Sequence, residues 1–131
     1  MTGIDTNILV RYFIKDDPLQ TPLAARFLRG RTPSDPGWVS LTVLAELAWV
    51  LSYSYKRKRA EILQVMDMLL ASEDIVVERE QVAMQAATIF RNGKADFPDC
   101  LIYALAKTAG CDRVLTFDRM SARDAGMDLL S

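Results

Sequence analysis

The 131-residue chain contains no histidine. This absence excludes Ser-His-Asp and Cys-His triads, histidine general bases and most zinc sites. The two cysteines, Cys100 and Cys111, match neither a CxxC motif nor a zinc-binding pattern, so we expect reduced thiols. Any catalysis must therefore use carboxylates, hydroxyls, lysines or metal ions.

Long hydrophobic runs and a charge excess are also absent. The longest apolar stretch, LTVLAELAWVL, contains Glu46 and is shorter than the roughly 20 apolar residues of a membrane span. Asp5 and Arg11 interrupt the apolar run that an export signal would need near the N-terminus. We therefore expect a cytoplasmic protein with no membrane association. The net charge of −1 argues against an extensive basic face for nucleic acid, though not against a small one.

Length and composition predict a single domain over residues 1–131. The hydrophobic fraction of 50% and the charged fraction of 25% are typical of a globular domain with a core. Short strand-like and helix-like segments alternate, which predicts an α/β fold with a parallel sheet and helices on both faces. We predict strands over 3–5, 38–40, 74–78, 113–118 and 127–130, and helices over 6–17, 21–30, 41–55, 56–72, 79–93, 96–109 and 119–126.

Five acids follow predicted strands or begin predicted helices: Asp5, Glu46, Asp96, Asp99 and Asp118. In open parallel sheets, ligands bind beyond the carboxyl ends of the strands, so we expect acids from four segments to meet at that edge. Each acid alone has a structural explanation, because acids in first turns cap helices and complement the helix dipole. Together they would repel one another unless a cation neutralised them. Oxygen ligands without histidine suit Mg²⁺ or Mn²⁺, and such sites usually serve phosphoryl chemistry.

Four elements of the sequence resemble the PIN domain family, and most closely the VapC-type ribonuclease toxins of bacterial toxin–antitoxin pairs. They are IDTNILV, the lone Glu46, ADFPDCLIYALAKTAGCD and VLTFDR. The resemblance covers almost the whole chain. It implies a three-layer α/β/α sandwich with a short central parallel sheet and a Mg²⁺- or Mn²⁺-dependent endoribonuclease acting on RNA. It also implies a homodimer that a small cognate antitoxin inhibits.

The same resemblance implies roles for individual residues. The catalytic acids match Asp5, Glu46, Asp99 and Asp118, and the small polar residues near the metal match Thr6, Asn7 and Thr116. Our hypothesis is that Asp5 and Asp99 hold the metal, with Asp118 and Asp96 acting through water. Glu46 would position the attacking water or a second ion. In-line attack would leave a 5′-phosphate and a 3′-hydroxyl.

Asp96 and Asp99 are three residues apart at the start of one predicted helix, and either could be the metal ligand there. Asp96 is expected near the N-cap of the helix, with Pro98 in the first turn and Asp99 near the third position. We therefore assign Asp99 as the metal ligand and Asp96 as the helix cap that supports it.

Other features have two interpretations each. Arg119 and Arg123 are candidates for gripping RNA, or they pair with nearby acids. The KRKR segment at 56–59 is favoured as a solvated helix junction over a phosphate contact. Trp49 and Tyr53, four residues apart, are favoured as core over an apolar groove for an antitoxin helix.

Three other functions fit an α/β domain with clustered acids. A receiver domain needs an adjacent acid pair after the first strand and a lysine after the last, and neither is present. A haloacid-dehalogenase-type phosphatase needs D-x-D, whereas the second position here is Asn7. A PIN-like scaffold that binds RNA or protein without cleavage stays open, although the intact acids speak against it.

Overall fold

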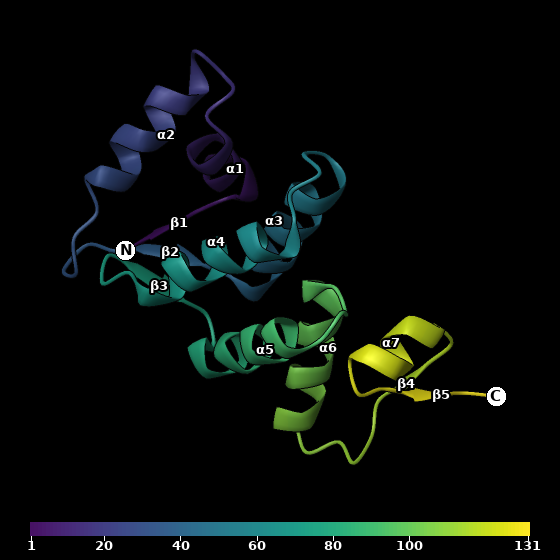
Figure 1. Cartoon of the computed structure of the whole chain (residues 1–131). Coiled ribbons are helices and arrows are strands. Elements are labelled where there is room, and N and C mark those ends of the chain that lie inside the picture. Colours follow the sequence, from purple (N-terminus) through teal and green to yellow (C-terminus); the bar gives the residue numbers. More distant parts are fainter. The chain divides into compact units, whose positions relative to one another are not determined.

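The computed structural model describes residues 1–131. The chain forms two compact units, Met1–Glu78 and Arg79–Ser131, which we call unit 1 and unit 2 (Figure 1). Unit 1 contains β1 (Thr2–Gly3), α1 (Thr6–Ile14), α2 (Gln20–Arg29), β2 (Gly37–Val39), α3 (Leu41–Tyr53), α4 (Arg59–Ala71) and β3 (Ile75–Val77). Unit 2 contains α5 (Glu80–Asn92), α6 (Phe97–Thr108), β4 (Leu115–Thr116), α7 (Arg119–Asp124) and β5 (Asp128–Leu129). None of the helices has the length and apolar character needed to cross a lipid bilayer.

The sheet of unit 1 is parallel, in the order β1-β2-β3. Gly37 stands opposite both Thr2 and Ile75 in the register, at the start of the central strand. The ladder continues one residue past β1, because the N–H of Ile4 donates to the carbonyl of Trp38 at 2.9 Å. The next residue, Asp5, then begins α1, so the first acid stands at the carboxyl end of its strand.

Local hydrogen bonds set the end of α1 and the start of α2. α1 ends where Lys15 takes a left-handed conformation, with φ at 61°, and its N–H donates to the carbonyl of Arg11. The carboxylate of Asp17 accepts from the N–H groups of Leu19 and Gln20, at 2.9 and 2.7 Å, which fixes the start of α2. These bonds hold the pKa of Asp17 below its usual value.

The core of unit 1 lies between α1, α3, α4 and the sheet. α3 buries its leucines, α1 contributes Leu9 and Val10, and α4 contributes Met66 and Leu69. α1 packs against both α2 and α3, and α4 packs against α3 and β3. Ser40 begins α3, because its Oγ accepts from the N–H of Val43 at 3.1 Å.

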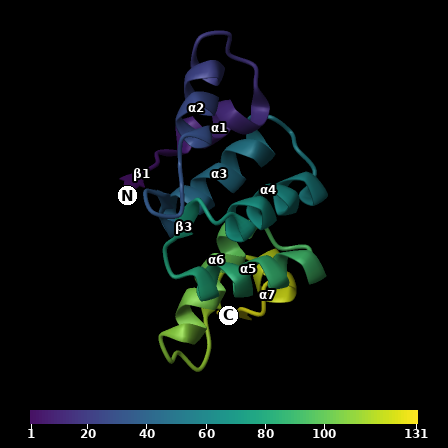
Figure 2. The ribbon, with the colours of Figure 1, turned by 90° about the vertical axis from the view of Figure 1, so that its left-hand side faces the viewer.

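Unit 2 is built on a close helix pair, α5 and α6, which lie side by side in both views (Figures 1 and 2). Small residues on the buried faces, Ala83 and Ala86 of α5 and Ala104 of α6, let the two backbones approach. Phe90 and Phe97 meet with ring centroids 5.8 Å apart. β4 and β5 form a two-stranded parallel sheet against which α7 packs.

The expected elements are all present, and the α/β class with parallel pairing is confirmed. Most elements are a few residues shorter than predicted, and the pairing forms a three-stranded sheet in unit 1 and a two-stranded sheet in unit 2. That residues 1–131 form one domain stays a prediction.

The favoured core position of Trp49 and Tyr53 is wrong. Their side chains are 51% and 59% exposed, and their rings stack with centroids 4.9 Å apart. The reason is that the leucines Leu44, Leu47 and Leu51 fill the buried face of α3. The two aromatic residues fall on the other side of the helix.

Gly37 gives a test of the sheet packing. A Cβ atom here would overlap with Cδ1 of Ile4 and lie 3.1 Å from Cδ1 of Ile75, in a core that is already filled. We predict that Gly37→Ala lowers the free energy of unfolding by about 1–3 kcal/mol, measured by urea denaturation. Gly3→Ala is the control, because the nearest atom to its new Cβ would be 3.9 Å away. An equal loss in both variants would contradict the packing argument.

Candidate active site

Unit 1 presents Asp5, Thr6 and Asn7 at the start of α1. Oδ1 of Asp5 accepts from the N–H of Thr6 at 2.8 Å, so the carboxylate caps the helix. Both Asp5 and Asn7 are exposed to solvent, whereas Thr6 is only 3% exposed. Asp5 forms no ion pair in the structure and is therefore available to a cation.

The hydroxyl of Thr6 is the one buried side-chain polar atom without a hydrogen-bond partner. Such a group costs about 1–3 kcal/mol if it stays unsatisfied, and it calls for a specific explanation such as a nearby ion or water. Thr6 directly follows Asp5, so the unsatisfied oxygen belongs to the same helix start as the first acid. An oxygen-binding ligand at this helix start would satisfy it.

Glu46 lies in the second turn of α3 and is exposed. It makes no ion pair or hydrogen bond within the protein, so its carboxylate is solvated by water. α3 packs against α1, the helix that Asp5 begins. Thus unit 1 holds two of the predicted catalytic acids on two packed helices.

Unit 2 holds the other three predicted acids, and the start of α6 positions two of them. Asp96 is the N-cap, and its Oδ1 accepts from the N–H of Asp99 at 2.9 Å. Pro98 occupies the first turn, where its missing N–H costs nothing. The predicted cap is confirmed: Asp96 caps α6, and Asp99 is its third residue. That Asp99 binds a metal stays a prediction.

Ser121 of α7 is a site neighbour that the sequence did not reveal. Its hydroxyl donates to Oδ2 of Asp99 at 2.7 Å, and the residue is 3% exposed. This bond fixes the carboxylate of Asp99 and ties α7 to α6. The only sequence signal was a serine three residues after Asp118, which is equally common in an ordinary helix.

Asp118 begins α7 and is supported by two short hydrogen bonds. Its Oδ1 accepts from the N–H of Met120 at 2.8 Å, and its own N–H donates to the hydroxyl of Thr116 at 3.0 Å. Thr116 therefore shapes the turn that carries Asp118. The turn places an exposed carboxylate beyond the end of β4.

The acids of unit 2 influence one another electrostatically. Partial desolvation of the Asp96 carboxyl raises its pKa above the usual value, and repulsion by Asp99 and Asp118 raises it further. The N–H of Asp99 opposes this by donating to the carboxylate. The repulsion shows that unit 2 brings Asp96, Asp99 and Asp118 into one neighbourhood.

The donor set is made of oxygen atoms, since the chain has no histidine, Cys100 in the first turn of α6 is fully buried, and Cys111 lies beyond the end of α6. Carboxylates and hydroxyls of this kind match the preferences of Mg²⁺ and Mn²⁺. Within either unit, no three acid or cysteine side chains are arranged so that they could hold an ion by themselves. The convergence of acids from all four segments stays a prediction.

The two arginines suggested for RNA differ in their surroundings. Arg123 forms a double hydrogen bond with the carboxylate of Asp124, at 3.0 and 3.2 Å, so the ion-pair interpretation applies to it. Arg119 is exposed and makes no ion pair. Of the two, Arg119 is the one whose charge is uncommitted, and RNA contact by either residue stays a prediction.

A family model for the PIN domain matches residues 4–126, which spans both units. The chain belongs to the PIN domain family. Among characterised proteins, this PIN domain is similar to a VapC ribonuclease of Aquifex aeolicus (strain VF5), with 25% identity over 119 residues. The match covers 91% of this chain and 88% of the relative. The expected PIN-like fold and the resemblance to the VapC type are therefore confirmed.

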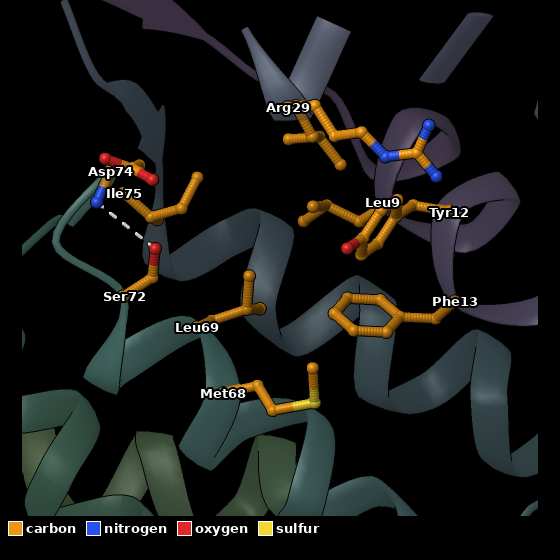
Figure 3. A pocket seen from close by; sticks show the side chains of 10 residues that line it. Leu9, Tyr12, Phe13, Arg29, Met68, Leu69, Ser72, Asp74 and Ile75 are labelled. Carbon is orange, nitrogen blue, oxygen red and sulfur yellow. Dashed lines mark hydrogen bonds between the residues drawn. The ribbon is translucent and has the colours of Figure 1, made fainter. Parts of the chain in front are cut away.

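This PIN domain also has an apolar pocket in unit 1, lined by α1, α2, α4 and the start of β3 (Figure 3). The pocket has a volume of about 290 Å³. Phe13 and Met68 face it from opposite helices, with Arg29 and Asp74 at its rim (Figure 3). A second hollow shares Phe13 and Met68 with this pocket, and a third, between α1 and α2, shares Tyr12 and Arg29. We call these three hollows around α1 the groove of unit 1.

The bond between Ser121 and Asp99 can be tested by its effect on stability. Ser121→Ala leaves a carboxylate oxygen of Asp99 without its donor, so we expect the free energy of unfolding to fall by about 1–3 kcal/mol. Urea denaturation measures the change. Ser54→Ala is the control, since Ser54 is exposed and its side chain makes no hydrogen bond in the structure; it should change stability by less than about 0.5 kcal/mol. A neutral Ser121→Ala would mean that the bond contributes nothing.

Proposed function

We propose that this PIN domain is a metal-dependent endoribonuclease and the toxin of a type II toxin–antitoxin pair, acting in the cytoplasm. The observation that carries the proposal is the neighbourhood of Asp96, Asp99 and Asp118 at two adjoining helix starts in unit 2. Family membership and the likeness to a VapC ribonuclease support it. The substrate would be RNA, cleaved at a phosphodiester bond.

In this proposal Asp5 and Asp99 would hold a Mg²⁺ or Mn²⁺ ion, with Asp118 and Asp96 acting through water. The donors are oxygen atoms, and the buried hydroxyl of Thr6, next to Asp5, has no hydrogen-bond partner within the protein. When bound, such an ion polarises the scissile phosphate and makes water a stronger nucleophile. Asn7 and Thr116 would support the first and last acids.

The chain's own residues would do the remaining work. Ser121 holds the carboxylate of Asp99 in one orientation, and Asp96 fixes the turn from which Asp99 projects. Glu46, exposed and unpaired, accepts a hydrogen bond from the attacking water and orients it. Arg119 and Arg123 grip the RNA backbone, with Arg119 the freer of the two. In-line attack at phosphorus would leave a 5′-phosphate and a 3′-hydroxyl.

The decisive experiment compares Asp99→Asn with Asp96→Asn. Both substitutions keep an oxygen that accepts the existing hydrogen bonds, so α6 should begin in the same way. Asp99→Asn should lower RNA cleavage by about 100-fold or more, while Asp96→Asn should mostly spare it, because asparagine also caps a helix. The measurement is cleavage of total RNA with mapping of the ends, with Mg²⁺ or Mn²⁺ added.

The same measurements distinguish a wrong ligand assignment from a wrong function. Equal loss in both would place Asp96 among the direct ligands. If the unmodified protein bound RNA and left it intact with either ion, the non-cleaving scaffold would be the better description. Binding of Mn²⁺, followed by electron paramagnetic resonance, should weaken in Asp99→Asn whatever the cleavage result.

The proposed antitoxin would occupy the groove of unit 1. The groove is apolar along Leu9, Phe13 and Met68, and Lys15, Arg26 and Arg29 make one end basic. These features suit an amphipathic helix with an apolar face and acidic residues at one end. A homodimer, as the family resemblance implies, completes the proposed assembly.

A charge placed in the groove should break this interaction. Met68 is 51% exposed, so Met68→Glu should fold normally while repelling an acidic partner helix. In a bacterial host, co-expression of the small protein encoded beside this chain should relieve growth arrest by the unmodified toxin. It should relieve arrest by the control Leu23→Glu, which is 62% exposed and outside the groove, but not arrest by Met68→Glu. Relief in all three cases would place the antitoxin elsewhere.

A further inference from the structure

One face of α3 carries a predicted catalytic acid and two exposed aromatic rings. Glu46, Trp49 and Tyr53 are spaced three and four residues apart, so they form one stripe along the helix. All three are exposed, whereas the leucines of α3 are buried. Trp49 stands one helical turn from Glu46, a rise of about 4.5 Å. Whatever the aromatic residues bind will lie next to the carboxylate.

The two rings are already stacked on each other. Their centroids are 4.9 Å apart and their planes differ by 22°. The stack leaves outer ring surface in solvent, since the two side chains keep half or more of their area exposed. A flat π-system could extend this stack without any rearrangement. Nucleobases bind aromatic side chains in this way, and the contact tolerates any sequence because every base has a π-face.

Two exposed lysines, Lys56 and Lys58, follow the stack in the chain, on either side of Arg57, which pairs with Glu61. The N–H of Arg57 donates to the carbonyl of Leu51 at 2.9 Å, which folds the loop back along the last turn of α3. Lys56 and Lys58 in this loop are exposed and form no ion pair in the structure. Stacked aromatic rings and lysines that follow within five residues of the chain are a combination that suits single-stranded nucleic acid. A second copy of the chain would need no such charge.

We propose that the Trp49–Tyr53 stack is a platform for an unstacked base of single-stranded RNA, with Lys56 and Lys58 against the neighbouring phosphates. The inference rests on the proposed ribonuclease function, since it is the RNA substrate that would lie here. It names the substrate class as single-stranded or looped RNA. A base held on Trp49 would place its nucleotide beside Glu46.

Tryptophan fluorescence tests the platform directly, because the chain has two tryptophans, Trp38 and Trp49. In a Trp38→Phe background, with EDTA present to prevent cleavage, emission comes from Trp49 alone. Octa-adenylate RNA should quench it, whereas an abasic octamer with the same phosphates should not. Equal quenching by both would overturn the stacking proposal.

Binding and kinetics of variants complete the test. Measured by anisotropy of labelled octa-adenylate, Trp49→Ala should weaken binding by about 5- to 100-fold, and Trp49→Phe should restore most of it. The control Met84→Ala, at 50% exposure on α5, should leave binding unchanged. In cleavage assays Trp49→Ala should raise KM, and kcat should fall as well, because the bound base would no longer exclude water from Glu46.

Two outcomes separate the platform from its alternatives. If Trp49→Ala turned a dimer into a monomer in sedimentation experiments and left RNA affinity unchanged, the face would be a contact between copies, and the proposal would be wrong. If the base-dependent quenching occurred but the unmodified protein cleaved no RNA, the platform would stand and the ribonuclease function would fail.

Discussion

The structure depends on one repeated interaction, in which a side-chain oxygen at the end of a strand or loop accepts the first free N–H groups of a helix. Asp5 does this for α1, Asp96 for α6 and Asp118 for α7. These three carboxylates are also proposed site residues, unlike that of Asp17 at the start of α2. An aspartate or an asparagine would cap these helices equally well. Only the proposed metal site needs the negative charge of aspartate.

Collecting carboxylates has an electrostatic cost, and unit 2 shows how part of it is met. The raised pKa of Asp96 reflects desolvation and repulsion by Asp99 and Asp118. The hydroxyl of Ser121 donates to Asp99, and backbone N–H groups donate to Asp96 and Asp118. These neutral donors reduce the repulsion without cancelling it. The remaining excess of negative charge is what the proposed cation would neutralise, and the same donors keep the carboxylates in fixed orientations.

Sequence patterns predicted helix starts and strand positions well because those are decided locally. Asp96 with Asp99 three residues later, and Asp5 before Thr6, carry their capping geometry in the sequence itself. Two features could not be predicted in this way. The partner of Asp99 is Ser121, 22 residues away, and only the packing of α7 against α6 brings them together. The exposure of Trp49 was missed because α3 has more apolar residues than its buried face can accommodate.

That surplus on α3 links the fold to the proposed chemistry. Burying Leu44, Leu47 and Leu51 sets the rotation of the helix, and this rotation leaves Glu46 and the aromatic stack together in solvent. An exposed carboxylate is a weak participant in catalysis, because water screens its charge. A substrate that stacks on Trp49 would exclude part of that water and strengthen every electrostatic contact made by Glu46. The face of α3 would thus acquire its proposed reactive environment only when RNA is bound.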